Sequence, residues 1–226
     1  METKVFNLII LDESGSMECI KKQALSGLNE TLQTIRIAQE KYPEQKQLVS
    51  IVPFESGNIR LLRDKKPIIH VRDLRPDEYR PGACTPLYDA IGYGVKSIRY
   101  AVKPEDSVLV TIITDGYENA SREYNSRTIA ALVNELKNEG WMFTYIGANQ
   151  DAVEVAKTMN INNALNFNQD EEGTKRMFAK ERKSRERYYG HRIECCQIDI
   201  NPQELAELQR NFSKSYNYFE EDLENK

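Results

Sequence analysis

Near the start of the chain stands the stretch Leu8-Ile9-Ile10-Leu11-Asp12-Glu13-Ser14-Gly15-Ser16-Met17, which decides the fold. It includes the end of a nearly continuous apolar run over residues 5–11, a pattern typical of a strand buried on both faces of a parallel sheet. The polar turn behind that run offers the carboxylate of Asp12 and the hydroxyls of Ser14 and Ser16. Oxygen ligands at the point where a strand turns into a helix suit a hard divalent cation such as Mg²⁺. The stretch therefore predicts a buried strand that ends in part of a metal site.

Strand and helix patterns alternate after this stretch. Apolar residues at helical spacing from Ile20 to Ala38 predict a helix that Pro43 ends. Further helices are predicted after Pro86 and over two later segments, 127–137 and 151–159. The other predicted strands cover residues 47–54, 59–63, 107–114, 141–146 and 164–167, with one more extended piece at 67–71. This alternation predicts an α/β fold with a doubly wound, mostly parallel six-stranded sheet, one antiparallel edge strand and helices on both faces.

Two later residues add oxygen atoms to the predicted site. Thr85 lies in Ala83-Cys84-Thr85-Pro86-Leu87, where threonine suits a helix N-cap and proline suits the first helical position. Asp115 follows the second nearly continuous apolar run, residues 107–114. Right-handed crossovers place the carboxyl ends of parallel strands along one edge of a sheet. Asp12 and Asp115 would thus flank the ligand-binding crevice if the strand order reverses between their strands.

These residues resemble the metal-ion-dependent adhesion site of von Willebrand factor A domains. The family motif is D-x-S-x-S, then a threonine on a later loop, then an aspartate after a central strand, and its positions are matched by Asp12, Ser14, Ser16, Thr85 and Asp115. The resemblance covers about residues 3–167, or on to 189, and is to the bacterial cytoplasmic type. It implies Mg²⁺ as the ion, with Mn²⁺ or Ca²⁺ as alternatives. It also implies direct ligation by Ser14, Ser16 and Thr85, with Asp12 and Asp115 acting through bound water.

The composition is that of a globular protein, with 226 residues, 40% hydrophobic content, 29% charged content and a net charge of −4. We expect a von Willebrand factor A domain over residues 1–190 and a helical C-terminal extension over residues 191–226. The negative charge argues against nucleic acid as the main partner. No apolar run approaches the roughly 18 residues that cross a bilayer. A secretory leader and a C-x-x-C pair are also missing, so we expect a cytoplasmic protein.

The function expected from this site is a non-enzymatic, metal-dependent protein-interaction module. An ion held by three neutral hydroxyls and two carboxylates keeps at least one coordination position for an outside ligand. An aspartate or glutamate of a partner protein would fill that position with a charge-assisted contact. Bacterial proteins that resemble this one often act beside AAA+ ATPases or in kinase and phosphatase signalling complexes, so we expect a complex of that kind and no membrane partner.

Other functions stay open at this point. A Mg²⁺-dependent phosphoryl-transfer or hydrolase enzyme would also place an aspartate at a strand end, but Ser14 stands where a D-x-D pair has its second acid. Nucleic-acid binding could use the basic segment 175–192, which Glu181 and Glu186 interrupt. In a further hypothesis, the acidic residues 220–222 fill the open metal position of their own or a neighbouring chain.

Overall fold

Strand β1 (Thr3–Asp12) lies inside the sheet and is buried along nearly its whole length, in agreement with its apolar sequence. The computed structural model describes residues 3–148, 151–196 and 201–220. The other strands are β2 (Gln45–Glu55), β3 (Asn58–Ile59), β4 (Arg63–Pro67), β5 (Ser107–Thr114), β6 (Met142–Ala148) and β7 (Asn163–Phe167). Their order in the sheet is β3-β2-β1-β5-β6-β7, with β4 also paired to β2.

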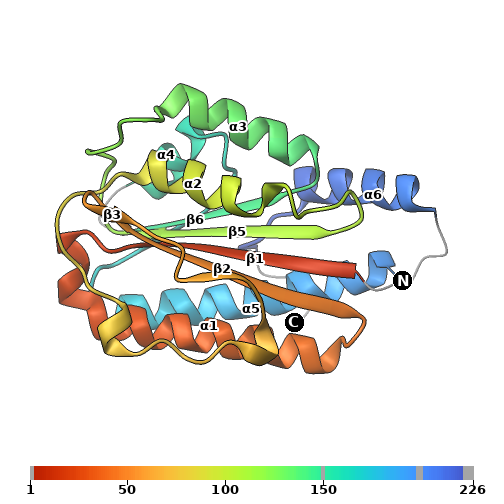
Figure 1. Ribbon diagram of the computed structural model, residues 1–226, viewed down its shortest axis with the longest axis horizontal. Helices are drawn as coiled ribbons and strands as arrows, with labels where there is room; N and C mark the ends of the chain where they lie inside the picture. The colour runs from red at the N-terminus through yellow and green to blue at the C-terminus, as the bar shows by residue number, and fades with distance from the viewer. Residues whose placement is uncertain (1–2, 149–150, 197–200, 221–226) are drawn as a thin grey trace.

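The pairings among β1, β2, β5, β6 and β7 are all parallel. The chain moves from β1 to β2 on one side and later crosses to β5 on the other side, so the strand order reverses between β1 and β5. This reversal is the switch point at which open α/β sheets bind ligands. The carboxyl ends of the parallel strands lie at the left of Figure 1, and the N-terminus lies at the right.

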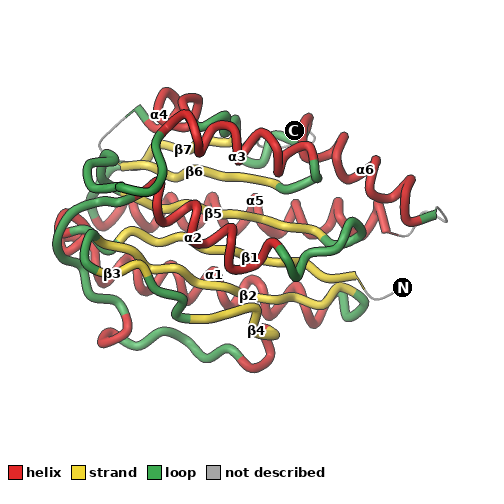
Figure 2. Tube along the Cα trace, turned by 45° about the horizontal axis from the view of Figure 1, so that its top comes forward, coloured by secondary structure: helices red, strands yellow, loops and turns green. Residues whose placement is uncertain are grey.

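The antiparallel edge differs from the single strand predicted over residues 59–63. The described residues form a sheet of seven strands, because two short strands, β3 and β4, pair with β2 in place of one (Figure 2). The pairing of β2 with β4 shifts register between Val49 and Ile51, and Lys65 in β4 has a positive φ of 45°. An irregularity of this kind interrupts a ladder and twists the edge. Residues 68–70, predicted as extended, instead form a short 3-10 turn.

The helices form a layer on each face of the sheet (Figure 1). Helices α1 (Lys21–Lys41) and α5 (Glu171–Cys196) cover one face, and α2 (Leu87–Arg99), α3 (Ser126–Asn138) and α4 (Ala152–Thr158) cover the other. The helix predicted from Ile20 to Ala38 is α1, and a 3-10 turn at Gly15–Ile20 precedes it. Among the described residues, no helix is long and apolar enough to cross a membrane.

Helices α1 and α5 pack very closely against each other. A Cβ atom at Gly27 would overlap the ring of Phe178, so only glycine permits this approach. Helix α5 continues through residue 190, so the expected boundary between residues 190 and 191 lies inside a helix. The division of the chain at that position stays a prediction.

Helix α5 carries a buried ion pair onto the sheet. Nε of Arg185 donates to Glu181 Oε1 over 2.7 Å, and both side chains are buried. The same guanidinium donates to Asn7 Oδ1 on β1 over 3.0 Å and to Thr111 Oγ1 on β5 over 2.7 Å. A charge is tolerated in a core only when such partners replace its water. The ion pair therefore fixes α5 across two central strands.

This arrangement weakens the hypothesis of nucleic-acid binding through residues 175–192. Arg185 lies in the core, and Arg192 is buried with its guanidinium 5.8 Å from the centre of the Phe212 ring. These two buried cations cannot contact a phosphate backbone, because proteins bind phosphates with cations on their surface. The sequence alone did not distinguish them from the exposed cations of the same helix.

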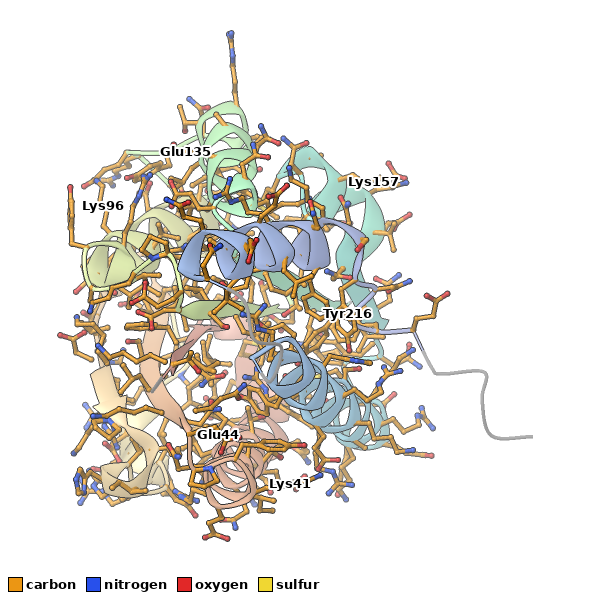
Figure 3. The ribbon with its side chains drawn as sticks, turned by 90° about the vertical axis from the view of Figure 1, so that its right-hand side faces the viewer. Lys41, Glu44, Lys96, Glu135, Lys157 and Tyr216 are labelled. Atoms are coloured by element: carbon orange, nitrogen blue, oxygen red, sulfur yellow. The ribbon has the colours of Figure 1, made fainter. Side chains whose placement is uncertain are left out.

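The C-terminal part is helical, as predicted, and it is packed on the domain. Helix α6 (Pro202–Ser215) begins at Asn201, whose side chain accepts the backbone N–H groups of Gln203 and Glu204. Figure 3 shows α6 lying across the end of the sheet between the α3 and α5 layers. Gln209 of α6 donates to the backbone oxygen of Glu105, just before β5, over 2.9 Å.

The segment after α6 returns to the core. Tyr218 is buried, its backbone N–H donates to Asn163 Oδ1 over 2.9 Å, and its hydroxyl donates to Glu181 Oε1 over 3.0 Å. Asn163 is the first residue of β7 and pairs with Thr144, which pairs with Thr111 of β5, so Tyr218 is held beside the middle of the central strands. The hypothesis that an acidic residue of the segment 220–222 fills the metal position stays a prediction. Residues 221 and 222 lie outside the described residues.

The buried pair gives a stability prediction. We expect Arg185→Met to lower the free energy of unfolding by about 3–5 kcal/mol, because Glu181 would keep its charge in the core without a cationic partner. Arg182→Met is the matched control, since Arg182 lies on the exposed face of the same helix and should change stability by less than about 0.5 kcal/mol. Urea unfolding followed by circular dichroism measures both. Equal effects of the two variants would contradict this account of α5.

Candidate metal centre

The candidate site is built where β1 and β5 end side by side. Residues 5–11 of β1 pair with residues 107–113 of β5, which places Asp12 beside Thr114. Thr114 Oγ1 donates to Asp12 Oδ2 over 2.5 Å, and the backbone N–H of Ser14 donates to Asp12 Oδ1 over 2.6 Å. The Asp12 side chain is fully buried. The pairing of two strands therefore holds this carboxylate in one orientation.

The turn after β1 that carries Ser14 and Ser16, the serine turn, contacts the loop after β5. Ser14 Oγ and Ser16 Oγ lie 3.1 Å apart, and Ser16 Oγ donates to Asp115 Oδ1 over 2.7 Å. Ser16 and Asp115 are 99 positions apart in the sequence. Hydrogen bonds thus connect four of the five predicted site residues: Asp12, Ser14, Ser16 and Asp115.

A third loop brings Thr85 to the same place. Its backbone is held on the serine turn by two hydrogen bonds, Gly82 N–H to Glu13 O over 2.7 Å and Gly15 N–H to Ala83 O over 3.1 Å. Ala83 has a φ of 55°, in the left-handed region that non-glycine residues rarely adopt. Backbone strain of this kind persists only where surrounding contacts enforce it.

The Thr85 side chain is buried beside the other four residues. A Cβ atom placed on Gly116 would lie 2.8 Å from Thr85 Oγ1 and 3.7 Å from Asp12 Oδ2, so both oxygens border the same small space. Asn119 fixes Thr85 from the other side, because its Oδ1 accepts the Thr85 N–H and its own N–H donates to Thr85 O. The structure therefore brings all five predicted residues together.

Sequence reasoning missed three polar side chains that support this set. Thr114 and Asn119 contact Asp12 and Thr85 as described, and Gln169 contacts Asp115. Thr114 carried a signal, because it is a hydroxyl residue directly before Asp115 at a strand end. Nothing in the sequence marked Asn119 or Gln169, whose contacts depend on how distant loops meet.

The two carboxyl groups of the site are raised in pKa. Burial raises the pKa of Asp12 to about 6, against the opposing hydrogen bonds from Thr114 and Ser14. Burial likewise raises the pKa of Asp115. A bound cation would favour the ionised form of both groups, since an adjacent positive charge offsets lost hydration. The electrostatics of the site therefore favour a bound cation next to the two carboxylates.

The donor atoms fit a hard divalent cation. Among the residues that the structure describes, no three His, Cys, Asp or Glu side chains gather as a metal site. Hydroxyl oxygens from Ser14, Ser16 and Thr85 would have to complete a ligand set around the two aspartates. Oxygen-only sets suit Mg²⁺, Mn²⁺ or Ca²⁺ better than they suit metals that prefer sulfur or nitrogen.

A buried glutamate beside the site fixes the loop that carries Thr85. Glu13 is fully buried, and Arg60 contacts both of its carboxylate oxygens. Its Oε1 also accepts the Arg80 N–H over 2.7 Å. Glu13 therefore joins the end of β1, the β3–β4 edge and the approach to Thr85 in one charge-assisted network.

Glu78 holds the loop that leads to Thr85 through a second set of hydrogen bonds. Its carboxylate accepts hydrogen bonds from Arg72 (2.6 Å), from the backbone N–H of Arg75 (3.0 Å) and from Arg63 (3.2 Å). Partial burial alone would raise the pKa of Glu78, but these donors outweigh it and lower the pKa to about 2. The ionised form of Glu78 thus stabilises the folded loop.

Comparison with known proteins identifies the fold. No protein-family model and no curated protein matches the sequence. Among solved structures, the SpRpn10 VWA domain superimposes with a TM-score of 0.51 at 9% identity, covering 78% of this chain and 94% of that chain. The vWF domain of the type V pili tip protein Mfa5 from Porphyromonas gingivalis gives 0.54 at 9% identity, with 81% and 95% covered. The fold is von Willebrand factor A-like.

A third structure extends the comparison to a larger protein. Proximal thread matrix protein 1 from the mussel byssus gives a TM-score of 0.57 at 13% identity, with 80% of this chain covered. This chain spans 46% of the length of that protein. Identities this low establish the von Willebrand factor A-like fold and confirm the predicted fold class. Metal binding by the five residues stays a prediction.

Glu78 gives a prediction with a defined pH dependence. We expect Glu78→Gln to destabilise the protein by about 2 kcal/mol at pH 7, because charge-assisted hydrogen bonds are lost. The pKa of Glu78 is lowered from 4.5 to about 2 on folding, so this stability is present above pH 4.5 and fades as the pH falls toward 2. The measurement is thermal unfolding of wild type and variant from pH 7 to pH 3, with the exposed Glu44→Gln as control. A constant difference across that range would contradict the prediction.

Proposed function

We propose that this chain is a non-enzymatic, metal-dependent protein-interaction module that binds an acidic side chain of a partner through a Mg²⁺-type ion. The observation that carries the proposal is the meeting of three loops, which places the serine turn in contact with Asp115 and Thr85 beside Asp12. Asp12, Ser14, Ser16, Thr85 and Asp115 would hold the ion. Mg²⁺ is the first candidate, and Mn²⁺ and Ca²⁺ are alternatives with the same preference for oxygen.

Charge balance explains why an acidic partner suits this site. The two carboxylates at most neutralise a divalent cation, and the three hydroxyls add no charge. Mg²⁺ takes about six oxygen ligands, so a set of this size leaves room for an outside ligand. A partner carboxylate there would gain a strong charge-assisted contact in a partly dehydrated setting.

The neighbouring structures support the proposal without deciding it. One structure of proximal thread matrix protein 1 is described with a zinc-occupied MIDAS motif, that is, a metal-ion-dependent adhesion site. It superimposes with a TM-score of 0.53 at 14% identity. Mfa5 is described as a tip protein of pili. A metal site and a place at the tip of a pilus thus occur among proteins with this fold, and the ligand chemistry of the present chain is consistent with metal binding.

The first test is metal binding by the isolated protein. Isothermal titration with Mg²⁺, Mn²⁺ and Ca²⁺ should show one site per chain for at least one of these ions. We expect Asp12→Ala and Ser16→Ala to weaken binding by about 10- to 100-fold or more, because each removes an oxygen of the site. Asp64→Ala, an aspartate on the edge strand β4, should leave affinity unchanged. Failure of the wild type to bind any of the three ions would overturn the proposal.

The second test concerns the partner. Proteins captured from the native host with Mg²⁺ should be released by a chelator and should be missing when Asp12→Ala is the bait. Replacement of single aspartates or glutamates by alanine in a captured partner should locate one residue that abolishes binding. A partner that binds equally well in chelator would contradict the metal-dependent mode.

Catalysis is tested separately, because the same ion could also serve phosphoryl transfer. We expect no phosphatase or ATPase activity, since Ser14 cannot replace the second carboxylic acid of a D-x-D pair as proton donor. Activity that is present in wild type and absent from Asp12→Ala would favour the enzyme hypothesis instead.

A further inference from the structure

Gln169 approaches the candidate site from an element that none of the five predicted ligands belongs to. It follows β7 and lies two positions before α5. Its side-chain Nε2 donates to the backbone oxygen of Ser16 over 2.8 Å and also donates to Asp115 Oδ2. These partners are 153 and 54 positions away in the sequence. A primary amide has two N–H donors, so one amide nitrogen can hold both acceptors.

The start of α5 does not need the Gln169 side chain. Asp170 Oδ1 accepts the Gly173 N–H over 2.6 Å, and Asp170 O accepts both the N–H of Thr174 (3.0 Å) and its hydroxyl (2.7 Å). Asp170 thus supplies the capping contacts of the first turn. The Gln169 side chain is directed away from the helix and toward the site.

The backbone around Gln169 is tightly held. A Cβ atom on Gly173 would overlap the backbone oxygen of Asn168, so glycine lets the first turn of α5 close onto the residue before Gln169. The contact fixes the direction in which residue 169 leaves the strand. A side chain on such a backbone can orient a distant group with little loss of entropy.

The contacts of Gln169 complete the orientation of Asp115. One carboxylate oxygen of Asp115, Oδ1, accepts the Ser16 hydroxyl, and the other, Oδ2, accepts the Gln169 amide. The amide also holds the peptide group of Ser16, whose hydroxyl is itself part of the site. An amide is neutral, so it can orient these groups without repelling a cation. A lysine or arginine at this position would repel the cation.

We propose that Gln169 is a positioning residue of the metal centre, whose amide orients Asp115 and Ser16 toward the bound ion. This inference rests on the proposed function, because it supposes a metal at the five residues. It adds a fourth segment, the β7–α5 junction, to the three loops that form the site. Groups that orient metal ligands commonly contribute as much to affinity as some ligands do.

The experiment measures Mn²⁺ affinity by titration of the full chain. Gln169→Met keeps the length of the side chain and removes its N–H donors, and Gln169→Ala removes both. If the donors matter, both variants weaken Mn²⁺ binding by about 10- to 100-fold. Asn168→Ala, an exposed neighbour, is the control and should bind as wild type does. Wild-type affinity in Gln169→Met would show that only packing matters and would overturn the proposal.

A double-mutant cycle tests whether Gln169 acts through Asp115. In the Asp115→Ala background, the effect of Gln169→Met should shrink to about threefold or less, because alanine removes the oxygen that accepts the Gln169 amide and residues in direct contact are not additive. Full additivity would overturn the positioning role. Failure of the wild type to bind Mn²⁺, Mg²⁺ or Ca²⁺ would instead overturn the proposed function together with this inference. Metal binding by the wild type, unchanged in Gln169→Met, would remove only the inference.

Discussion

The parallel pairing of β1 with β5 is the constraint on which the candidate site depends. It aligns the ends of two buried strands, so that Thr114 can donate to Asp12 and Asp115 can accept from Ser16. Parallel strands end at the same edge of a sheet, and the reversal of strand order leaves no crossover above this position. A one-residue slip between β1 and β5 would separate Thr114 from Asp12.

The loops above these strand ends enclose an unfavourable electrostatic arrangement. Two carboxyl groups, Asp12 and Asp115, are buried close together, and burial raises the pKa of each. The surrounding loops supply hydroxyl, amide and backbone N–H donors instead of cationic side chains. Arginines of the same region are engaged elsewhere, as with Arg60 on Glu13. The negative charge of the two carboxylates is therefore not balanced by a cationic side chain, and a bound metal ion can balance it.

The face of the sheet that α5 covers uses charge in another way. Arg185 and Glu181 are paired, buried and bonded to two central strands, and Tyr218 joins them from the end of the described chain. Each nitrogen of the Arg185 guanidinium donates to a buried partner, and Glu181 balances its charge. This network attaches α5 and the C-terminal segment to the domain, whereas the charges around Asp12 are arranged for binding.

Local patterns predicted the alternation of the main strands and helices and the fold class, because burial periodicity depends on near neighbours in the sequence. The resemblance to the von Willebrand factor A motif then joined Ser14, Ser16 and Thr85 to Asp12 and Asp115 as one candidate site. Asp12 and Asp115 could be recognised because each directly follows a buried strand. Other features depended on contacts between distant segments. No local pattern marked the contacts of Gln169 and Asn119 or the return of Tyr218 to the core. The same holds for Arg185, which is buried against Asn7, a residue 178 positions away. Their partners are chosen by the packing of whole elements, and only the tertiary structure brings those elements together.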